Sequence, residues 1–293
     1  MIIDIRSKLI LGTANFGNAY GVANKGELLS IQDSQALIKW AQENGINHFD
    51  TAFAYGKAEE ILGVNLDRSL HPTVDTKLDV LSCRSSKSIV ESTKSAKERL
   101  GVDQISTLYI HNEELLQASN MNEIVTGFNK VLSLGLVKHI GVSVYSESAA
   151  LAWKNSFPQL SVFQVPENIC DRRLASSEAM KELSDKGNTL IVRSVFLQGL
   201  LLMDPFSIPS NLVAAKENLE ALIDFAGASS LTVMELCLAY AHSITWASGI
   251  VVGVTSINQL KEIVGQPYLL PTGWDSVIKT LPANIIDPRR WSL

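Results

Sequence analysis

Short apolar segments and helical segments alternate along almost the whole chain of 293 residues. Each apolar segment has the length of a buried strand, and most helical segments begin or end at Ser, Asn or Gly. Strands that alternate with helices form parallel βαβ units, and eight such units favour closure of the sheet. The sequence therefore predicts an α/β fold of the (β/α)8 TIM-barrel type, with eight parallel strands. The predicted strands are 8–11, 46–49, 73–77, 105–110, 137–142, 161–165, 189–192 and 249–252.

The longest interruption of this alternation contains Pro205 and Pro209 and follows the seventh predicted strand. We interpret it as a long active-site loop. The C-terminal tail, 285–291, is expected to lie over one face of the barrel. No change in composition divides the chain, so a single domain over 1–293 is expected. The predicted helices are 30–44, 58–66, 86–100, 121–134, 147–155, 176–186, 211–226, 232–242 and 257–264.

A doubly wound open sheet is the alternative arrangement for alternating strands and helices. Dinucleotide-binding sheets of that kind carry G-x-G-x-x-G directly after the first strand. That motif is absent after 8–11, where Gly12 and Thr13 stand. The barrel is therefore the preferred prediction.

Composition excludes several classes of function. The net charge is −5 and no cluster of five or more basic residues is present, which argues against a nucleic-acid partner. No apolar run approaches the ~18 residues that a membrane helix needs. Cys83, Cys170 and Cys237 are far apart and odd in number, as in proteins of a reducing compartment. Since the N-terminus also lacks the pattern of a signal peptide, a cytoplasmic location is expected.

Charged side chains end three neighbouring strands of the predicted barrel. Asp50 follows the second strand, Lys77 ends the third and His111 follows the fourth. Tyr55 lies five residues after Asp50, in a polar turn. Barrel enzymes build their active sites at the carboxyl ends of the strands and in the loops after them. A single charged strand end often has only a structural role, but these four residues together predict a catalytic site.

These side chains can polarise and protonate a carbonyl group. A free tyrosine has a pKa of ~10, and a neighbouring lysine ammonium is expected to lower that value by stabilising the phenolate. Asp50 would keep the ammonium of Lys77 charged and oriented, and His111 can donate a hydrogen bond to the carbonyl oxygen. None of them supplies a reductant, so a hydride-donating cofactor is implied. The remaining histidines lack the spacing of metal ligands, and we predict no metal.

The order and spacing of these four residues resemble the Asp-Tyr-Lys-His tetrad of the aldo-keto reductases. The likeness extends from Leu-Gly-Thr at 11–13 to Gly-Val-Thr-Ser at 253–256. It implies NADP(H), less often NAD(H), bound extended across the carboxyl face of the barrel. By resemblance, Tyr55 is the proton donor, Lys77 tunes its pKa, Asp50 is the partner of Lys77 and His111 orients the carbonyl.

The resemblance also implies a set of cofactor-binding residues. Ser143 and Gln164 would hold the nicotinamide carboxamide, and the loop after the seventh strand would follow the pyrophosphate. Gly253 and the residues after it would approach the adenosine end. The implied set is Gly12, Thr13, Asp50, Ser143, Gln164, Arg193, Ser194, Leu197, Gly199, Gly253, Thr255 and Gln259.

Several positions depart from the pattern of the family. Val144 stands where the family usually has Asn beside the carboxamide, and Gln259 stands where an Arg often meets the 2′-phosphate. A neutral amide recognises that phosphate less strongly than a guanidinium does. Arg193 replaces an aromatic residue that stacks on the nicotinamide, and its guanidinium could stack there or meet a substrate anion. Asn112 and Glu113 make the expected substrate pocket more polar.

The predicted function is NAD(P)H-dependent reduction of an aldehyde, ketone or sugar carbonyl, or the reverse oxidation. Two alternatives stay open at this point. Family relatives serve as regulatory subunits of membrane channels, so a nucleotide-binding regulatory protein is one. A Schiff-base lyase that uses Lys77 is the other, since barrels host many such enzymes. The expected partner is a small-molecule substrate, and the chain is expected to be a monomer or a small homo-oligomer.

Overall fold

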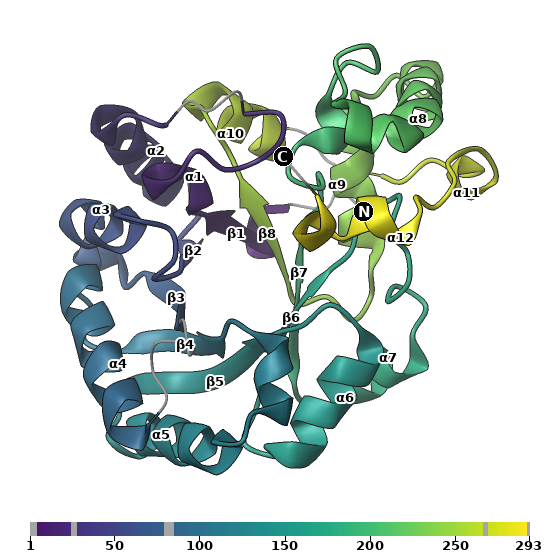
Figure 1. The fold of residues 1–293 in the computed structure, drawn as a ribbon. Helices are drawn as coiled ribbons and strands as arrows, with labels where there is room; N and C mark the ends of the chain where they lie inside the picture. The colour runs from purple at the N-terminus through teal and green to yellow at the C-terminus, as the bar shows by residue number, and fades with distance from the viewer. Residues whose placement is uncertain (1–4, 25–27, 79–84, 266–268, 292–293) are drawn as a thin grey trace.

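In the computed structural model, eight parallel strands close into a barrel in the order of the sequence, and β8 pairs with β1 (Figure 1). The structure describes residues 5–24, 28–78, 85–265 and 269–291, so that Cys83 lies outside the described residues. The (β/α)8 prediction is confirmed. The strands are β1 (Leu9–Gly12), β2 (His48–Asp50), β3 (Thr73–Leu78), β4 (Ile105–Ile110), β5 (Val137–Ser143), β6 (Val162–Pro166), β7 (Thr189–Arg193) and β8 (Gly249–Gly253).

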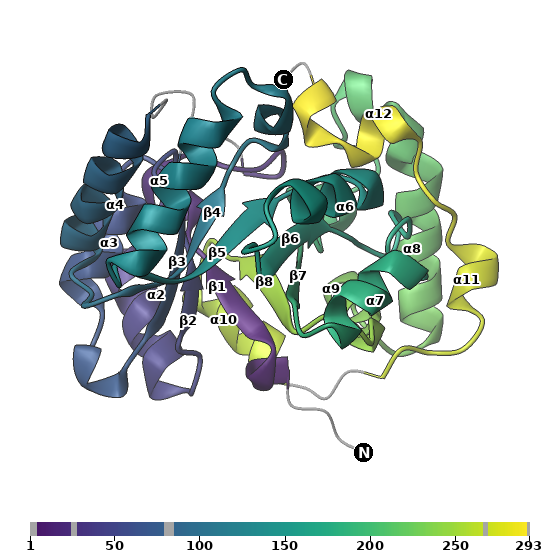
Figure 2. The same ribbon diagram turned by 90° about the horizontal axis from the view of Figure 1, so that it is seen from below.

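Helices surround this barrel as an outer ring (Figures 1 and 2). Hydroxyl caps begin several of them: the Ser30 side chain accepts from the Asp33 amide, and Thr232 and Glu235 form a reciprocal capping box. The α-helices are α1 (Ala14–Gly17), α2 (Ile31–Glu43), α3 (Ala58–Asn65), α4 (Ser86–Leu100), α5 (Met121–Ser133), α6 (Glu147–Ser156), α7 (Glu178–Asp185), α8 (Lys216–Ala228), α9 (Val233–Ser243), α10 (Ile257–Val264), α11 (Trp274–Val277) and α12 (Ala283–Ile286). Short 3-10 helices are η1 (Ile5–Ser7), η2 (Arg68–Leu70), η3 (Glu113–Gln117), η4 (Leu200–Leu202), η5 (Ser210–Ala215) and η6 (Pro288–Arg290).

The segment between β7 and β8 is more structured than predicted. It was expected to hold a loop and a helix at 211–226, but that helix begins as the 3-10 turn η5 and continues as α8 to Ala228. Pro209 directly precedes this 3-10 turn, and its backbone nitrogen carries no hydrogen that could donate a hydrogen bond. No single helix among the described residues is long and apolar enough to cross a membrane. Only η5 with α8, taken together with α9, reaches that length and apolar character, and the chain bends by 91° between them.

The register of the strands brings charged side chains to one level of the barrel. Asp50 in β2 lies opposite Asp75 in β3, and Lys77 is two residues further along the same strand. Because side chains two residues apart share a face of a strand, Asp75 and Lys77 point to the same side, with Lys77 nearer the carboxyl end. A small cluster of buried apolar side chains fills the barrel interior: Ile10, Tyr109, Val162 and Ile191.

Candidate active site

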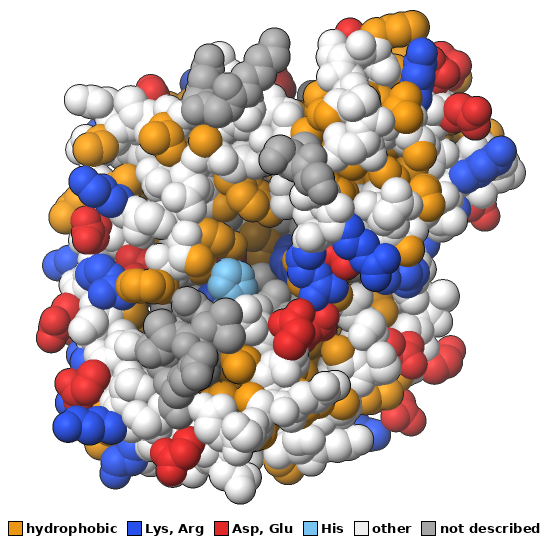
Figure 3. Space-filling model, in the orientation of Figure 1, with side chains coloured by type: hydrophobic (Ala, Val, Ile, Leu, Met, Phe, Trp, Pro, Cys, Tyr) orange, Lys and Arg blue, Asp and Glu red, His pale blue; other side chains and the backbone are white. Residues whose placement is uncertain are grey.

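A cleft of about 1300 Å³ lies at the carboxyl ends of the strands. Figure 3 shows the hollow in this face, with a histidine side chain at its edge and a group of basic and acidic side chains beside it. Seven of the eight strands contribute a residue to the lining, and His111 directly follows the remaining one, β4, as expected for a barrel active site. All of the sequence-predicted site residues except Leu197 line it: Gly12, Thr13, Asp50, Tyr55, Lys77, His111, Ser143, Gln164, Arg193, Ser194, Gly199, Gly253, Thr255 and Gln259.

Asp50 and Lys77 form a buried ion pair in the floor of the cleft. The Lys77 Nζ atom lies 2.5 Å from Oδ2 of Asp50 and donates a second hydrogen bond to the Thr51 carbonyl oxygen, at 3.0 Å. The other carboxylate oxygen of Asp50 accepts a 2.8 Å bond from Nε2 of Gln164. Both oxygens of Asp50 are therefore engaged, which fixes the ammonium in position.

Tyr55 lies above this ion pair. The Lys77 Nζ atom is 5.4 Å from the centroid of the Tyr55 ring. The loop that carries Tyr55 packs closely on α1, because a Cβ atom at Gly17 would stand only 2.0 Å from the Tyr55 carbonyl oxygen. A glycine is needed there for that approach. Asn18 also ties this loop by donating a 2.8 Å bond to the Ala54 carbonyl.

The pKa of Tyr55 is raised above its ordinary value, and the expected lowering by Lys77 is not found. Burial is the largest cause and the negative charge of Asp50 is the second, while Arg193 acts in the opposite direction. We attribute the difference to the ion pair, in which Asp50 offsets the field of the ammonium. At neutral pH Tyr55 therefore holds its proton and can donate it.

His111 is a second polar ring in the cleft, close to Tyr55. Its ring centroid is 6.4 Å from that of Tyr55, with the planes at 86°. Burial lowers the pKa of His111 to about 4, and the charges of Lys77 and Arg193 add to that effect. The imidazole is therefore neutral at physiological pH and carries one N–H, which can donate to a carbonyl oxygen.

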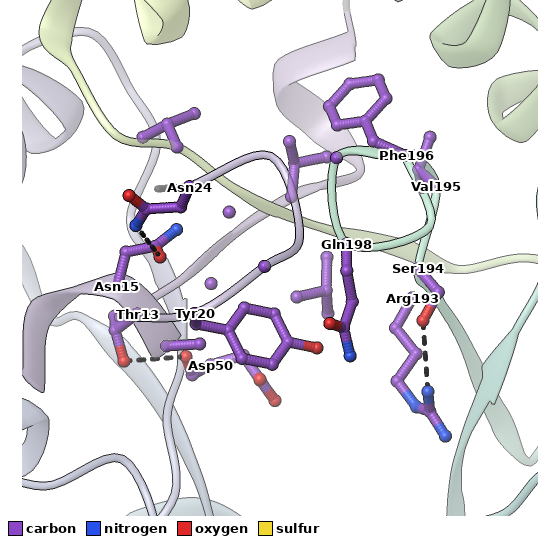
Figure 4. A pocket seen from close by; sticks show the side chains of 18 of the residues that line it. Thr13, Asn15, Tyr20, Asn24, Asp50, Arg193, Ser194, Val195, Phe196 and Gln198 are labelled. Atoms are coloured by element: carbon purple, nitrogen blue, oxygen red, sulfur yellow. Dashed lines mark hydrogen bonds between the residues drawn. The ribbon is translucent and has the colours of Figure 1, made fainter. Parts of the chain in front are cut away.

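The loop after β7 has an unusual backbone. Ser194, Leu197 and Gln198 have φ of 64°, 48° and 55°, in the left-handed region that non-glycine residues rarely adopt. Such residues cost free energy and cluster at ligand-binding sites. The side chain of Leu197, one of the predicted cofactor-binding residues, is fully buried and is not among those that line the cleft. Its neighbour Gln198 projects into the pocket instead (Figure 4).

The opposite end of the cleft is polar and includes carboxylates. The Gln259 Oε1 atom accepts from the amide and the hydroxyl of Thr255, at 2.8 and 3.0 Å, so the Gln259 carbonyl is committed to its own loop. Asp33 and Glu262 line the same end, where α2 and α10 pack together. These two acids were not predicted from the sequence.

Several further lining residues were missed because they lie in loops or short helices rather than at strand ends. Tyr20 projects into the middle of the pocket in Figure 4. Val144, one of the departures from the family pattern, is buried away from the cleft, and the next residue, Tyr145, lines it. Other residues missed in this way are Asn15, Asn24, Phe196, Gln198 and Arg289.

Two other sequence features lie apart from this cleft. Asp171 and Arg173 form an ion pair at 2.7 Å and do not line it. Trp291, in the tail, donates a 3.0 Å bond to the Ile285 carbonyl and is likewise not among the lining residues. Within the described part of the chain, no group of three or more His, Cys, Asp or Glu residues is arranged to hold a metal ion.

Comparisons with known proteins agree with this geometry. The model of the Aldo/keto reductase family matches residues 8–267. The chain is 25% identical to a probable voltage-gated potassium channel subunit beta of Arabidopsis thaliana, over 91% of this chain and 90% of that protein. It is 24% identical to a D-threo-aldose 1-dehydrogenase of Pseudomonas sp, over 62% of this chain and 66% of the relative. The fold resembles that of PA4992 of Pseudomonas aeruginosa, assigned to the aldo-keto reductases, with a TM-score of 0.65, 19% identity and 88% of each chain covered.

Proposed function

The chain belongs to the aldo/keto reductase family and is an NAD(P)-dependent oxidoreductase, and from this premise we propose that Tyr55 donates the proton when a small aldehyde, ketone or sugar is reduced. The observation that carries the proposal is the convergence of Tyr55, His111 and the Lys77–Asp50 pair at one end of the cleft. The hydride for the carbonyl carbon would come from a reduced nicotinamide when one is bound.

His111, Tyr55 and the Lys77–Asp50 pair have different roles in the proposed reaction. The neutral imidazole of His111 donates its N–H to the carbonyl oxygen and orients it. Tyr55 transfers its phenolic proton to that oxygen as negative charge develops there, with the buried ammonium of Lys77 lying 5.4 Å from the centroid of its ring. Asp50 keeps that ammonium in place. The same groups serve alcohol oxidation, with the proton moving in the opposite direction.

The cleft has groups suited to an extended dinucleotide. Gln164 donates to Asp50 through Nε2, which leaves its Oε1 for the amide hydrogens of a carboxamide, next to Ser143. The left-handed backbone around Gln198 is of the kind that anion-binding loops use, and we propose that the pyrophosphate lies there, although the amides of Leu197, Gly199 and Leu200 donate to carbonyls of the same loop. At the adenosine end, Nε2 of Gln259 is the donor for a 2′-phosphate, and we propose NADP(H) over NAD(H) with a small margin.

The Schiff-base alternative is disfavoured by the contacts of Lys77. A lysine nucleophile must lose its proton, but this ammonium is paired with Asp50 and donates to the Thr51 carbonyl. The regulatory alternative has support from the likeness to a channel subunit beta. The presence of Tyr55, Lys77 and His111 in one cleft favours the enzyme.

Titration with NADPH and NADH, followed by a panel of carbonyl compounds read at the nicotinamide absorbance, tests the proposal. Tyr55→Phe is expected to lower turnover by roughly 100- to 10,000-fold, because it removes the general acid, with the cofactor dissociation constant unchanged. Tyr240→Phe is the matched control, since Tyr240 is a buried tyrosine outside the cleft. Equal activities of Tyr55→Phe and the wild type would end the proposal.

A further inference from the structure

Two arginines and a tyrosine form one wall of the cleft. The guanidinium carbon of Arg193 lies 4.3 Å from the centroid of the Tyr145 ring, and that of Arg289 lies 3.6 Å from the same centroid. Arg193 ends β7, Tyr145 follows β5 and Arg289 belongs to η6 in the tail. All three line the cleft. The tyrosine ring thus holds two like-charged groups close together through cation–π contacts.

The charge of Arg289 is offset by acids. Its Nε atom lies 2.9 Å from Oδ1 of Asp287, and its Nη1 atom lies 2.9 Å from Glu113 and 3.1 Å from Glu114. These contacts fasten the tail to the loop after β4, directly after His111 and Asn112. They also neutralise acids that would otherwise repel an anion entering the cleft.

The charge of Arg193 has no such partner. Within the described residues, Arg193 is found in no ion pair, and its one side-chain hydrogen bond runs from Nη1 to the Ser194 hydroxyl, at 3.2 Å. Its Nε atom is buried and lacks an acceptor. A buried donor on a charged group is costly to leave unpaired. The wall therefore holds a cation that lines the cleft and has no acidic partner among the described residues.

The position of this cation is at the reacting end. The charge of Arg193 acts to lower the pKa of both Tyr55 and His111, so its guanidinium lies close enough to influence the pair that would hold the carbonyl. The carboxylates Asp33 and Glu262 line the other end of the cleft. An anion on Arg193 would thus sit beside the carbonyl.

We propose that Arg193 binds an anionic group, a carboxylate or a phosphate, carried by the carbonyl substrate. Tyr145 and Arg289 position its guanidinium, whose planar fork matches both groups. During reduction the hydride adds to the carbonyl carbon, Tyr55 gives its proton to the oxygen, and the anionic group leaves unchanged on the alcohol. The inference rests on the proposed carbonyl reduction.

Matched pairs of aldehydes test it, with one arm for each anion. Succinic semialdehyde is compared with butanal, and glyceraldehyde 3-phosphate with glyceraldehyde. The wild type is expected to favour the charged member of at least one pair by about 10- to 100-fold in kcat/KM, the range of a charge-assisted contact. Arg193→Met should lower kcat/KM for the charged member far more than for the neutral one and so abolish that preference, while the NADPH dissociation constant, read by fluorescence, shows whether any loss lies in cofactor binding.

Arg290→Met is the control, since Arg290 is a neighbouring arginine of the tail that pairs with Asp287 and does not line the cleft. It should keep the wild-type preference. Equal losses for both members of a pair, or weaker NADPH binding by Arg193→Met, would overturn the inference and place Arg193 on the cofactor. A wild type that reduces the neutral aldehydes without favouring a charged one would also overturn it. A wild type that reduces neither class would instead count against the proposed function.

Discussion

The ammonium nitrogen of Lys77 lies 2.5 Å from Oδ2 of Asp50, and the two side chains are only 2% and 4% exposed. A charge pair so deeply buried costs desolvation, which the close contact offsets. Removing one partner leaves the other as an unpaired charge away from water. Gln164 adds a hydrogen bond to the same carboxylate, so the pair also anchors a residue that we propose binds the cofactor.

We expect Asp50→Asn and Lys77→Met each to lower the free energy of unfolding by about 3–5 kcal/mol, because each leaves a buried charge uncompensated. The double variant should lose much less than the two single losses together. Urea unfolding of the four proteins measures the coupling. Strictly additive losses would show that the two charges do not support each other.

His111 should remain neutral and active across physiological pH, since burial lowers its pKa to about 4. The pH profile of kcat/KM should therefore show no inflection near the ordinary histidine value of ~6.5. Between pH 4 and 6.5 the unfolded chain binds the proton more readily than the folded one, so this group makes stability rise with pH over that window. His111→Gln should flatten that rise relative to the wild type in urea unfolding at pH 4.5 and 7. An unchanged slope would contradict the lowered pKa.

Glu167 should act in the opposite sense. It is fully buried, accepts bonds from the Tyr240 hydroxyl at 2.7 Å and the Leu174 amide at 2.9 Å, and burial raises its pKa from 4.5 to about 8. Between those values the folded chain holds the proton more tightly, so this group makes stability fall as pH rises.

Glu167→Gln should remove that fall, because the amide stays neutral at every pH. We expect it to gain roughly 1–3 kcal/mol relative to the wild type between pH 5 and 8, measured by urea unfolding. Glu178→Gln, a change at an exposed acid of α7, is the control and should shift stability little at either pH. A parallel pH dependence of Glu167→Gln and the wild type would refute the prediction.

Gln259→Arg should strengthen the selection of NADPH. A guanidinium makes charge-assisted bonds to a 2′-phosphate, whereas the amide makes neutral ones beside the carboxylates of Asp33 and Glu262. The ratio of the NADH to the NADPH dissociation constant is expected to rise about tenfold in fluorescence titrations. Glu262→Gln should raise it in the same direction by a smaller factor. If neither variant changes the ratio, the adenosine end lies elsewhere.

The sequence by itself determined the barrel and the positions of Asp50, Tyr55, Lys77 and His111 in one cleft. Both follow from local pattern, because strand length, strand order and the two-residue side-chain period place the carboxyl ends of parallel strands on the same face. Motif spacing then located most of the lining on β1, β5, β6 and β8 as well.

Only the tertiary structure decided how loop side chains meet and what charge they hold. Glu113 and Arg289 are 176 residues apart in the sequence and lie in hydrogen-bond contact, and Tyr145 lies under two arginines. Leu197 turns inward while Gln198 turns toward the cleft. The pKa of Tyr55 rises because burial and Asp50 outweigh the nearby positive charges. Each of these contacts and pKa values depends on all of the groups packed around a side chain. Many of those groups are distant in the sequence, so residue spacing alone does not predict the result.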